Sequence, residues 1–358
     1  MKKKYIKLSN KIKFKKKENI KNEKEINYGL AILKSFLALL VIMAHCFDTG
    51  TTKNKIIFYM LKYLSAHVSS FFIISFYFTS SHLSSLKIKK NLERLMRLLI
   101  PFIGWPLIIL KINKIFNKKY NKSLQVSYEA LKNQLLWGCV YLDHFWFLWD
   151  MIVITISFFI IIFIFRKHFL FILQIILIMS YISQYSGYNF NKNKNFPYHM
   201  KYPLGRIAES VTYSITGFIL GYYKVIDLLQ KHKIKTIIIS AMIYEVMLDY
   251  HIFSNIMGFG YQGIDLNIKS ICLILVFAML PFEIIKNKEF KKIIRILTNY
   301  SGGVYYLHIS FSQYLSVYFD DVKKRNFKGI LINYAAGYIT CFVGTIILGK
   351  TPLKYLFC

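Results

Sequence analysis

The sequence predicts an all-α fold, a polytopic integral-membrane bundle of about ten helices, and three observations support this. Of the 358 residues, 55% are apolar and 17% aromatic, yet the formal net charge is +31. A soluble or disordered protein this basic would not be so apolar, so the charged and apolar residues must be segregated along the chain. The apolar residues do lie in long runs of about 20, the length that crosses a bilayer.

Ten such runs divide the chain into three parts. A basic tail over residues 1–27 precedes a transmembrane domain over 28–350, and a short tail over 351–358 follows it. The predicted spans are 29–47, 64–85, 95–115, 145–165, 168–186, 204–223, 234–250, 267–285, 296–317 and 329–349.

The basic residues predict the orientation of these spans. Residues 1–25 hold eleven lysines and few apolar side chains, so they are expected to lie as a cytoplasmic tail near anionic lipid. A nucleic-acid partner is not expected, because the tail adjoins a membrane span. The loops on the side of the tail hold more Lys and Arg than the opposite loops, which places both termini of this multi-pass protein in the cytoplasm.

No sequence motif indicates a metal or a tightly bound cofactor. The five cysteines are scattered and form no CxxC pair, so neither a disulfide framework nor a metal site is predicted. The chain also lacks a P-loop, a GxSxG elbow, an HExxH helix and a dinucleotide fingerprint.

Lys34 and His45 are polar residues inside the first span. They are eleven residues apart, about three helical turns, so they share one helix face at a separation of roughly 16 Å. Polar groups in hydrocarbon are costly and therefore mark candidate functional sites. The alternative is a lysine that snorkels to the interface and a histidine that only packs.

Arg94 and Arg97 lie at i and i+3 where the third span leaves the cytoplasm. Two guanidinium groups on one helix face suit a phosphate-bearing ligand. Anchoring of the span by the positive-inside rule explains them equally well.

Polar and aromatic residues gather at the outer start of the fourth span, where an interfacial aromatic belt is the simpler explanation. The candidates for binding an acceptor there are Asp143, His144, Trp146, Trp149 and Asp150. Secondary candidates in later spans, each of which has a structural alternative, are Arg206, Glu209, Glu245, Asp249, Tyr306 and His308.

Six segments in order resemble acyltransferase family 3, the bacterial membrane O-acetyltransferases of surface polysaccharides. Lys34 and His45 match the family's basic residue and histidine in the first span, with Lys in place of the commoner Arg. Phe76 departs from the family, because a small Gly usually follows Ile-Ser in the second span. The other segments are LERLMRLLIPFIGW, HFWFLWDMIV, RIAESVTYSITGFILGYY and VYYLHIS, and the likeness covers about residues 28–310.

The resemblance implies a bacterial inner-membrane enzyme that takes an acyl group from cytoplasmic acetyl-CoA and transfers it to a hydroxyl of a surface or lipid-linked glycan. By this resemblance acetyl-CoA is expected to be a co-substrate, and no tightly bound cofactor is expected. His45 would be the general base or a transient acyl carrier, since an imidazole can do either. Lys34, Arg94 and Arg97 would hold the donor.

The resemblance also implies that the aromatic and polar residues at the start of the fourth span bind the acceptor sugar. The alternative function is a transporter or flippase of lipid-linked glycans, in which the same cations bind pyrophosphate and no covalent chemistry occurs. A glycan polymerase is a third and weaker alternative.

Overall fold

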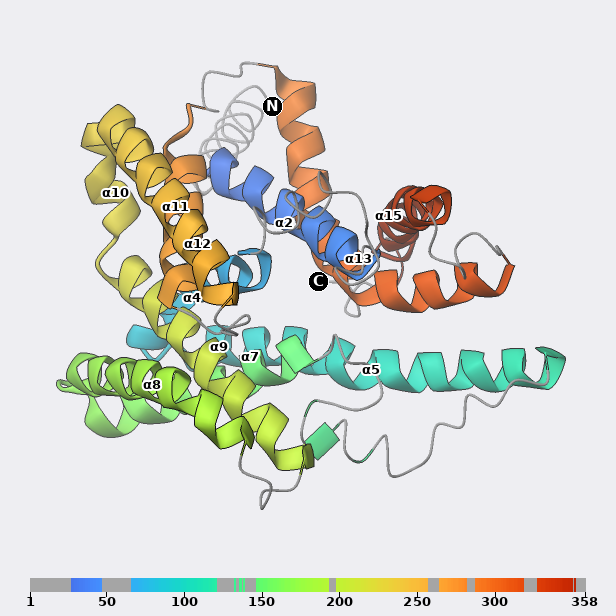
Figure 1. Ribbon diagram of the computed structural model, residues 1–358, viewed down its shortest axis with the longest axis horizontal. Coiled ribbons are helices and arrows are strands. Elements are labelled where there is room, and N and C mark those ends of the chain that lie inside the picture. The colour runs from blue at the N-terminus through green and yellow to red at the C-terminus, as the bar shows by residue number, and fades with distance from the viewer. Residues whose placement is uncertain are drawn as a thin grey trace, which may run out of the picture.

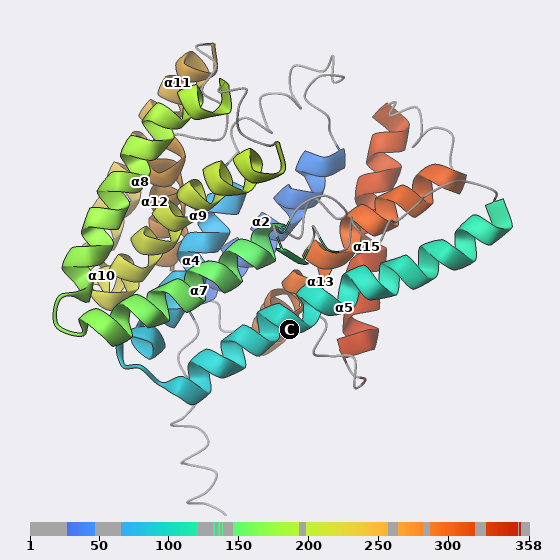
Figure 2. The same cartoon turned by 90° about the horizontal axis from the view of Figure 1, so that it is seen from below.

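The computed structural model is a bundle of long helices (Figures 1 and 2). It describes residues 27–46, 66–120, 146–192, 198–256, 264–281, 287–318 and 327–349, with isolated positions 132, 135, 136, 138 and 351. Strands are absent from the described residues, which confirms the all-α prediction. The helices are α2 (Tyr28–Cys46), α4 (His67–Ser84), α5 (Ile88–Tyr120), α7 (Trp146–Phe165), α8 (Phe169–Lys192), α9 (Tyr198–Tyr222), α10 (Val225–Leu229), η2 (Gln230–His232), α11 (Lys233–Ile256), α12 (Ile264–Met279), α13 (Lys288–Tyr318) and α15 (Phe327–Gly349).

Each of the ten predicted spans overlaps one helix, although several helices extend beyond the apolar run and α12 ends at Met279, before the end predicted at residue 285. The third and ninth predicted spans, 95–115 and 296–317, correspond to α5 and α13, which begin seven to eight residues earlier. Both added segments are rich in lysine, so hydropathy alone places the helix start too late. A helix can continue through a charged turn just as it does through an apolar turn, because Lys, Arg and Glu are good helix formers.

Only part of this bundle meets a strict criterion for crossing a membrane. Among the described helices, Trp146–Phe165 alone is both long and apolar enough. Shorter apolar stretches occur at Tyr28–Ile42, Phe169–Gln184 and Tyr334–Ile347. The number of spans and the orientation of the termini therefore remain predictions.

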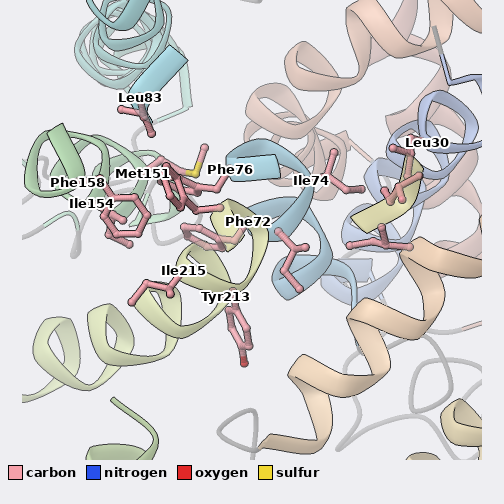
Figure 3. Packing of buried hydrophobic residues seen from close by; sticks show 14 of the residues in the cluster. Leu30, Phe72, Ile74, Phe76, Leu83, Met151, Ile154, Phe158, Tyr213 and Ile215 are labelled. Carbon is pink, nitrogen blue, oxygen red and sulfur yellow. The ribbon is translucent and has the colours of Figure 1, made fainter. Parts of the chain in front are cut away.

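Helix α4 lies at the centre of the core and most of its surface is buried, although Phe78 and Ser81 are exposed (Figure 3). The core around it contains Phe72 and Phe76 of α4, Phe158 of α7 and Ile215 of α9. Aromatic rings fill much of it, and Phe158 contacts both Phe76, with ring centroids 5.1 Å apart, and a phenylalanine of α9. This core fixes the positions of α4 and α7, which form two walls of the pocket described below.

Two glycines let α9 approach α4 closely. A Cβ added at Gly217 would lie 2.2 Å from the carbonyl oxygen of Ile73, and one at Gly221 would lie 2.3 Å from that of Tyr77. The two glycines are four residues apart in GFILG, the small-xxx-small spacing that allows helix backbones to meet in membranes.

We expect Gly217→Ala to destabilise the protein by about 1–3 kcal/mol, because the new methyl group meets backbone and the helices must separate. Gly344→Ala is the matched control, since nothing lies within 4 Å of a Cβ built there. Thermal melting of the two purified variants in detergent measures the difference. Equal melting temperatures would show that the close contact of α4 and α9 does not limit stability.

Two segments that are predicted to be cytoplasmic come together at the end of α12, at Asn27 and Gln230. Asn27 and Gln230 both donate side-chain hydrogen bonds to the carbonyl oxygen of Ala278, at 3.3 and 3.5 Å. The start of α2, the segment before α11 and the end of α12 therefore share one end of the bundle. We call it the N-terminal end, and the opposite end the far end. At the far end, the hydroxyls of Ser69 and Ser270 are 2.5 Å apart.

Candidate functional site

A pocket of about 600 Å³ lies between α2, α4, α5, α7 and α13. In Figure 2, α5 lies along α7 on one side of the bundle and passes α13. The pocket thus joins helices that are far apart in the sequence. The cations predicted to hold a donor, Lys34, Arg94 and Arg97, all line it.

The polarity of the residues that line the pocket changes along its length. Phe71 and His82 both line it, and they are eleven positions apart along α4, which corresponds to roughly 16 Å. At the N-terminal end the lining includes His82, Lys90 and Glu93, whereas toward the far end it includes Phe71, Phe147 and Leu148. A ligand that fills the pocket must therefore have an anionic or polar end and a less polar end.

Arg94 is held on one wall by neutral groups. Its Nε donates to Oγ1 of Thr155 at 3.2 Å, and its Nη1 donates to the carbonyl oxygen of Ser75 at 3.4 Å and to Oγ1 of Thr79. Its guanidinium carbon lies 4.8 Å from the centroid of the Phe76 ring. We call Ser75, Phe76, Thr79 and Thr155 the Arg94 cradle.

The Arg94 cradle leaves the positive charge uncompensated. Nη2 of Arg94 is buried and has no hydrogen-bond partner in the described part of the chain, and no carboxylate there forms an ion pair with the guanidinium. A buried charge is costly unless it is paired and hydrogen-bonded. The pocket wall therefore includes a cation that no carboxylate of the described residues neutralises, and an anionic ligand would supply the missing negative charge.

Arg97 differs from Arg94 although the two are only three residues apart. Its side chain is 64% exposed, and its guanidinium lies 4.0 Å from the carboxylate of Glu93, which also binds Lys90 at 3.2 Å. The hydrogen bond from Lys90 and the nearby cations lower the pKa of Glu93, so this carboxylate is charged at neutral pH. The pocket rim thus carries a solvated charge cluster, whose ion pairs are weak.

A second buried arginine, Arg206 of α9, is fully neutralised. It lies 2.9 Å from the carboxylate of Asp150, which also accepts a hydrogen bond from Ser210 at 2.6 Å. The guanidinium carbon of Arg206 lies 5.0 and 5.9 Å from the rings of Trp146 and Trp149. Asp150 is 0% exposed, so the structure places this predicted acceptor residue in an ion pair that joins α7 to α9.

His45 lies in the last turn of α2, and its side chain is outside the described residues. One turn before it, Val41 packs in a cluster with Leu148, and Phe71 and Phe147 pack against that cluster. These three residues also line the pocket toward its far end. Since residues four apart share a helix face, the backbone position of His45 lies one turn beyond this end of the pocket.

The remaining candidates are not brought to the pocket by the described structure. Asp143 and His144 lie outside the described residues, as do the side chains of Asp249, Tyr306 and His308. Glu245 is exposed on α11, and Glu209 of α9 is partly buried, but neither lines the pocket. Within the described part of the chain, no cluster of three His, Cys, Asp or Glu residues could hold a metal ion.

The pocket includes polar residues that sequence reasoning missed. Ser75 and Thr79 of α4 and Thr155 of α7 hold Arg94, and His82 lines the N-terminal end. Ser75 and Thr79 are four residues apart in an otherwise aromatic run, so they share a helix face. The Thr79 hydroxyl was a usable signal, because a hydroxyl group in an apolar helix often binds across to another helix. Ser75 gave no such signal, because it binds Arg94 through its backbone carbonyl oxygen.

A family model described as an acyltransferase domain, the acyltransferase 3 type, matches residues 27–350. No curated protein and no solved structure matches the chain.

Proposed function

Because the chain belongs to acyltransferase family 3, we propose that it is a membrane O-acetyltransferase that uses a cytoplasmic acyl-CoA and modifies a glycan. The acceptor is a hydroxyl of a cell-surface or lipid-linked sugar. The single observation that carries the donor assignment is Arg94, a partly buried cation on the pocket wall that no carboxylate of the described residues neutralises. Phosphate oxygens provide the charge and the acceptors that such a guanidinium lacks.

The shape and lining of the pocket support an acyl-CoA over a simple anion. Acyl-CoA has phosphates at one end and an acyl-pantetheine arm at the other, and the pocket is charged at the N-terminal end and apolar toward the far end. In this proposal Arg94 and Arg97 hold the phosphates, Lys34 lies beside the arm, and the thioester reaches the last turns of α2.

Transfer proceeds by proton removal and attack on the thioester. His45 takes the proton of the sugar hydroxyl as general base, and the hydroxyl oxygen attacks the thioester carbonyl carbon. The carbon–sulfur bond then breaks, and the thiolate of CoA takes up the proton from the imidazole. The products are the sugar acetate and free CoA. If the imidazole is instead a transient acyl carrier, it forms an acyl-imidazole that the hydroxyl then cleaves.

The acceptor is proposed to bind at the far end, near the start of α7. Trp146 and Trp149 supply aromatic faces there, and Asp143 and His144 precede them in the sequence. Asp150 is fully buried and paired with Arg206, so we assign it the role of a positioning residue. Its ion pair fixes α7 against α9 and thereby the two tryptophans that flank Arg206.

The proposed location is the bacterial cytoplasmic membrane, with both termini inside; the outer surfaces of the helices support the membrane location. Large apolar side chains are exposed along α5, α7, α8, α11 and α15. Exposed apolar surface of this extent marks a membrane or protein contact. Such faces on many helices fit a bundle surrounded by lipid.

Mass spectrometry of the surface glycan tests the function as a whole. Cells that lack the gene are expected to lose one acetyl group per modified sugar and to regain it when the gene is restored. A flippase of lipid-linked glycans predicts a different result, since its loss would reduce the amount of glycan without removing acetyl groups. An unchanged acetyl content in the deletion strain would contradict the proposal.

A further inference from the structure

The ring of Phe76 packs against the guanidinium of Arg94. Phe76 is 0% exposed and lies on the central helix α4, one residue after Ser75 and three before Thr79, both of which bind the same guanidinium. Its ring centroid is 4.8 Å from the guanidinium carbon, within the distance of a cation–π contact. Phe76 is not among the residues that line the pocket, so it contacts the cation from behind.

A comparison of Arg94 with Arg206 shows what the ring of Phe76 contributes. Arg206 also faces aromatic rings, but Asp150 neutralises its charge. Arg94 has an aromatic face and neutral acceptors in place of a carboxylate. The face of an aromatic ring attracts a cation through its quadrupole and adds no net charge, so the guanidinium keeps its full positive charge for a ligand.

We infer that Phe76 is a positioning residue for the donor, which holds Arg94 in place without neutralising it. The inference rests on the proposed function, because the ligand of Arg94 is taken to be the acyl-CoA phosphates. The ring contact and the hydrogen bonds from Nε and Nη1 together hold the guanidinium in one position on the pocket wall. Phe76 thus acts through Arg94 and does not touch the donor.

Binding of acetyl-CoA to the purified full-length protein in detergent tests this role. Phe76→Leu removes the ring face but keeps an apolar side chain, and we expect it to raise the Kd for acetyl-CoA about three- to thirtyfold, the range between an exposed and a desolvated cation–π contact. Phe76→Tyr keeps the ring and should stay within about twofold of the wild type. Should Phe76→Leu not be recovered in folded form, Phe76→Met makes the same test.

Phe218→Leu is the matched control for a general loss of core packing. Phe218 is also 0% exposed and belongs to the same aromatic core, but in the described residues its ring contacts are other aromatic rings and no cation. Its substitution should leave the Kd for acetyl-CoA within about twofold of the wild type. An equal rise in Kd for Phe218→Leu and Phe76→Leu would overturn the inference, because a packing defect would then explain both.

A double variant tests whether Phe76 acts through Arg94. In an Arg94→Gln background, Phe76→Leu should add less than about twofold to the Kd, since the cation that it positions is gone. A full additional effect would overturn the inference. A wild-type protein that binds no acetyl-CoA would overturn the proposed function and this inference together. Weakened binding in Arg94→Gln with normal binding in Phe76→Leu would overturn the inference alone.

Discussion

His45→Gln is expected to lower acetyl transfer by about 10² or more, the usual effect of removing a general base. Glutamine reproduces a hydrogen bond of the imidazole but does not take up a proton at neutral pH. His45 shares a face of α2 with Val41, which packs with residues that line the pocket toward the far end. An acyl group that enters from the N-terminal end would meet a sugar hydroxyl near this turn.

The measurement is acetyl transfer from acetyl-CoA to the glycan, with protein level and acetyl-CoA binding measured alongside. Both should stay near the wild type in His45→Gln, and His45→Asn should behave in the same way. His232→Gln is a suitable control, because His232 is exposed on η2. Near-normal transfer by the His45 variants would exclude it as the base, and His144 and His308 would be the next residues to test.

Arg94→Gln is expected to weaken acetyl-CoA binding by about 30-fold or more. Truncating one partner of a buried, hydrogen-bonded charge pair costs about 2–5 kcal/mol, and each 1.4 kcal/mol is a factor of ten in affinity. Glutamine retains a polar side chain for the Arg94 cradle, so the fold should persist while the charge is lost. Arg94→Lys should restore part of the affinity, since a lysine keeps the charge but does not bind in a bidentate manner.

Arg97→Gln is the matched comparison for Arg94→Gln. Arg97 is mostly exposed and paired with Glu93, so its loss should weaken binding less than about fivefold, in line with exposed ion pairs of up to about 1 kcal/mol. The two arginines are equivalent candidates in the sequence, whereas in the structure Arg97 is much more exposed than Arg94. Equal effects of the two substitutions would show that the rim and the buried wall contribute equally to donor binding.

The positions of the helices were predictable because hydrophobic runs of fixed length are a strong signal. Every long apolar run corresponds to a helix, and the runs around α7 and α15 agree with the helix ends to within two residues. The starts of α5 and α13 were not predictable from hydropathy, because charged turns continue both helices. An apolar run predicts a helix, but it does not by itself establish that the helix is surrounded by lipid and crosses the membrane.

The candidate site was only partly predictable, for a physical reason. Charges in apolar runs are rare enough to be noticed, which is how Lys34, Arg94 and Arg97 were chosen, and the structure brings them to one pocket. Partners were harder to predict, because pairing depends on how helices pack. The ion pair of Arg206 with Asp150 joins two helices, so the spacing of residues along one helix does not predict it.

The most direct test of the central claim uses proteoliposomes with one orientation of the protein. Labelled acetyl-CoA is supplied on the side of the N-terminus, and the glycan acceptor on the opposite side. The account predicts that labelled acetyl groups appear on the acceptor, and that Arg94→Gln and His45→Gln reduce this transfer. Movement of unlabelled glycan across the membrane without any acetyl transfer would contradict it.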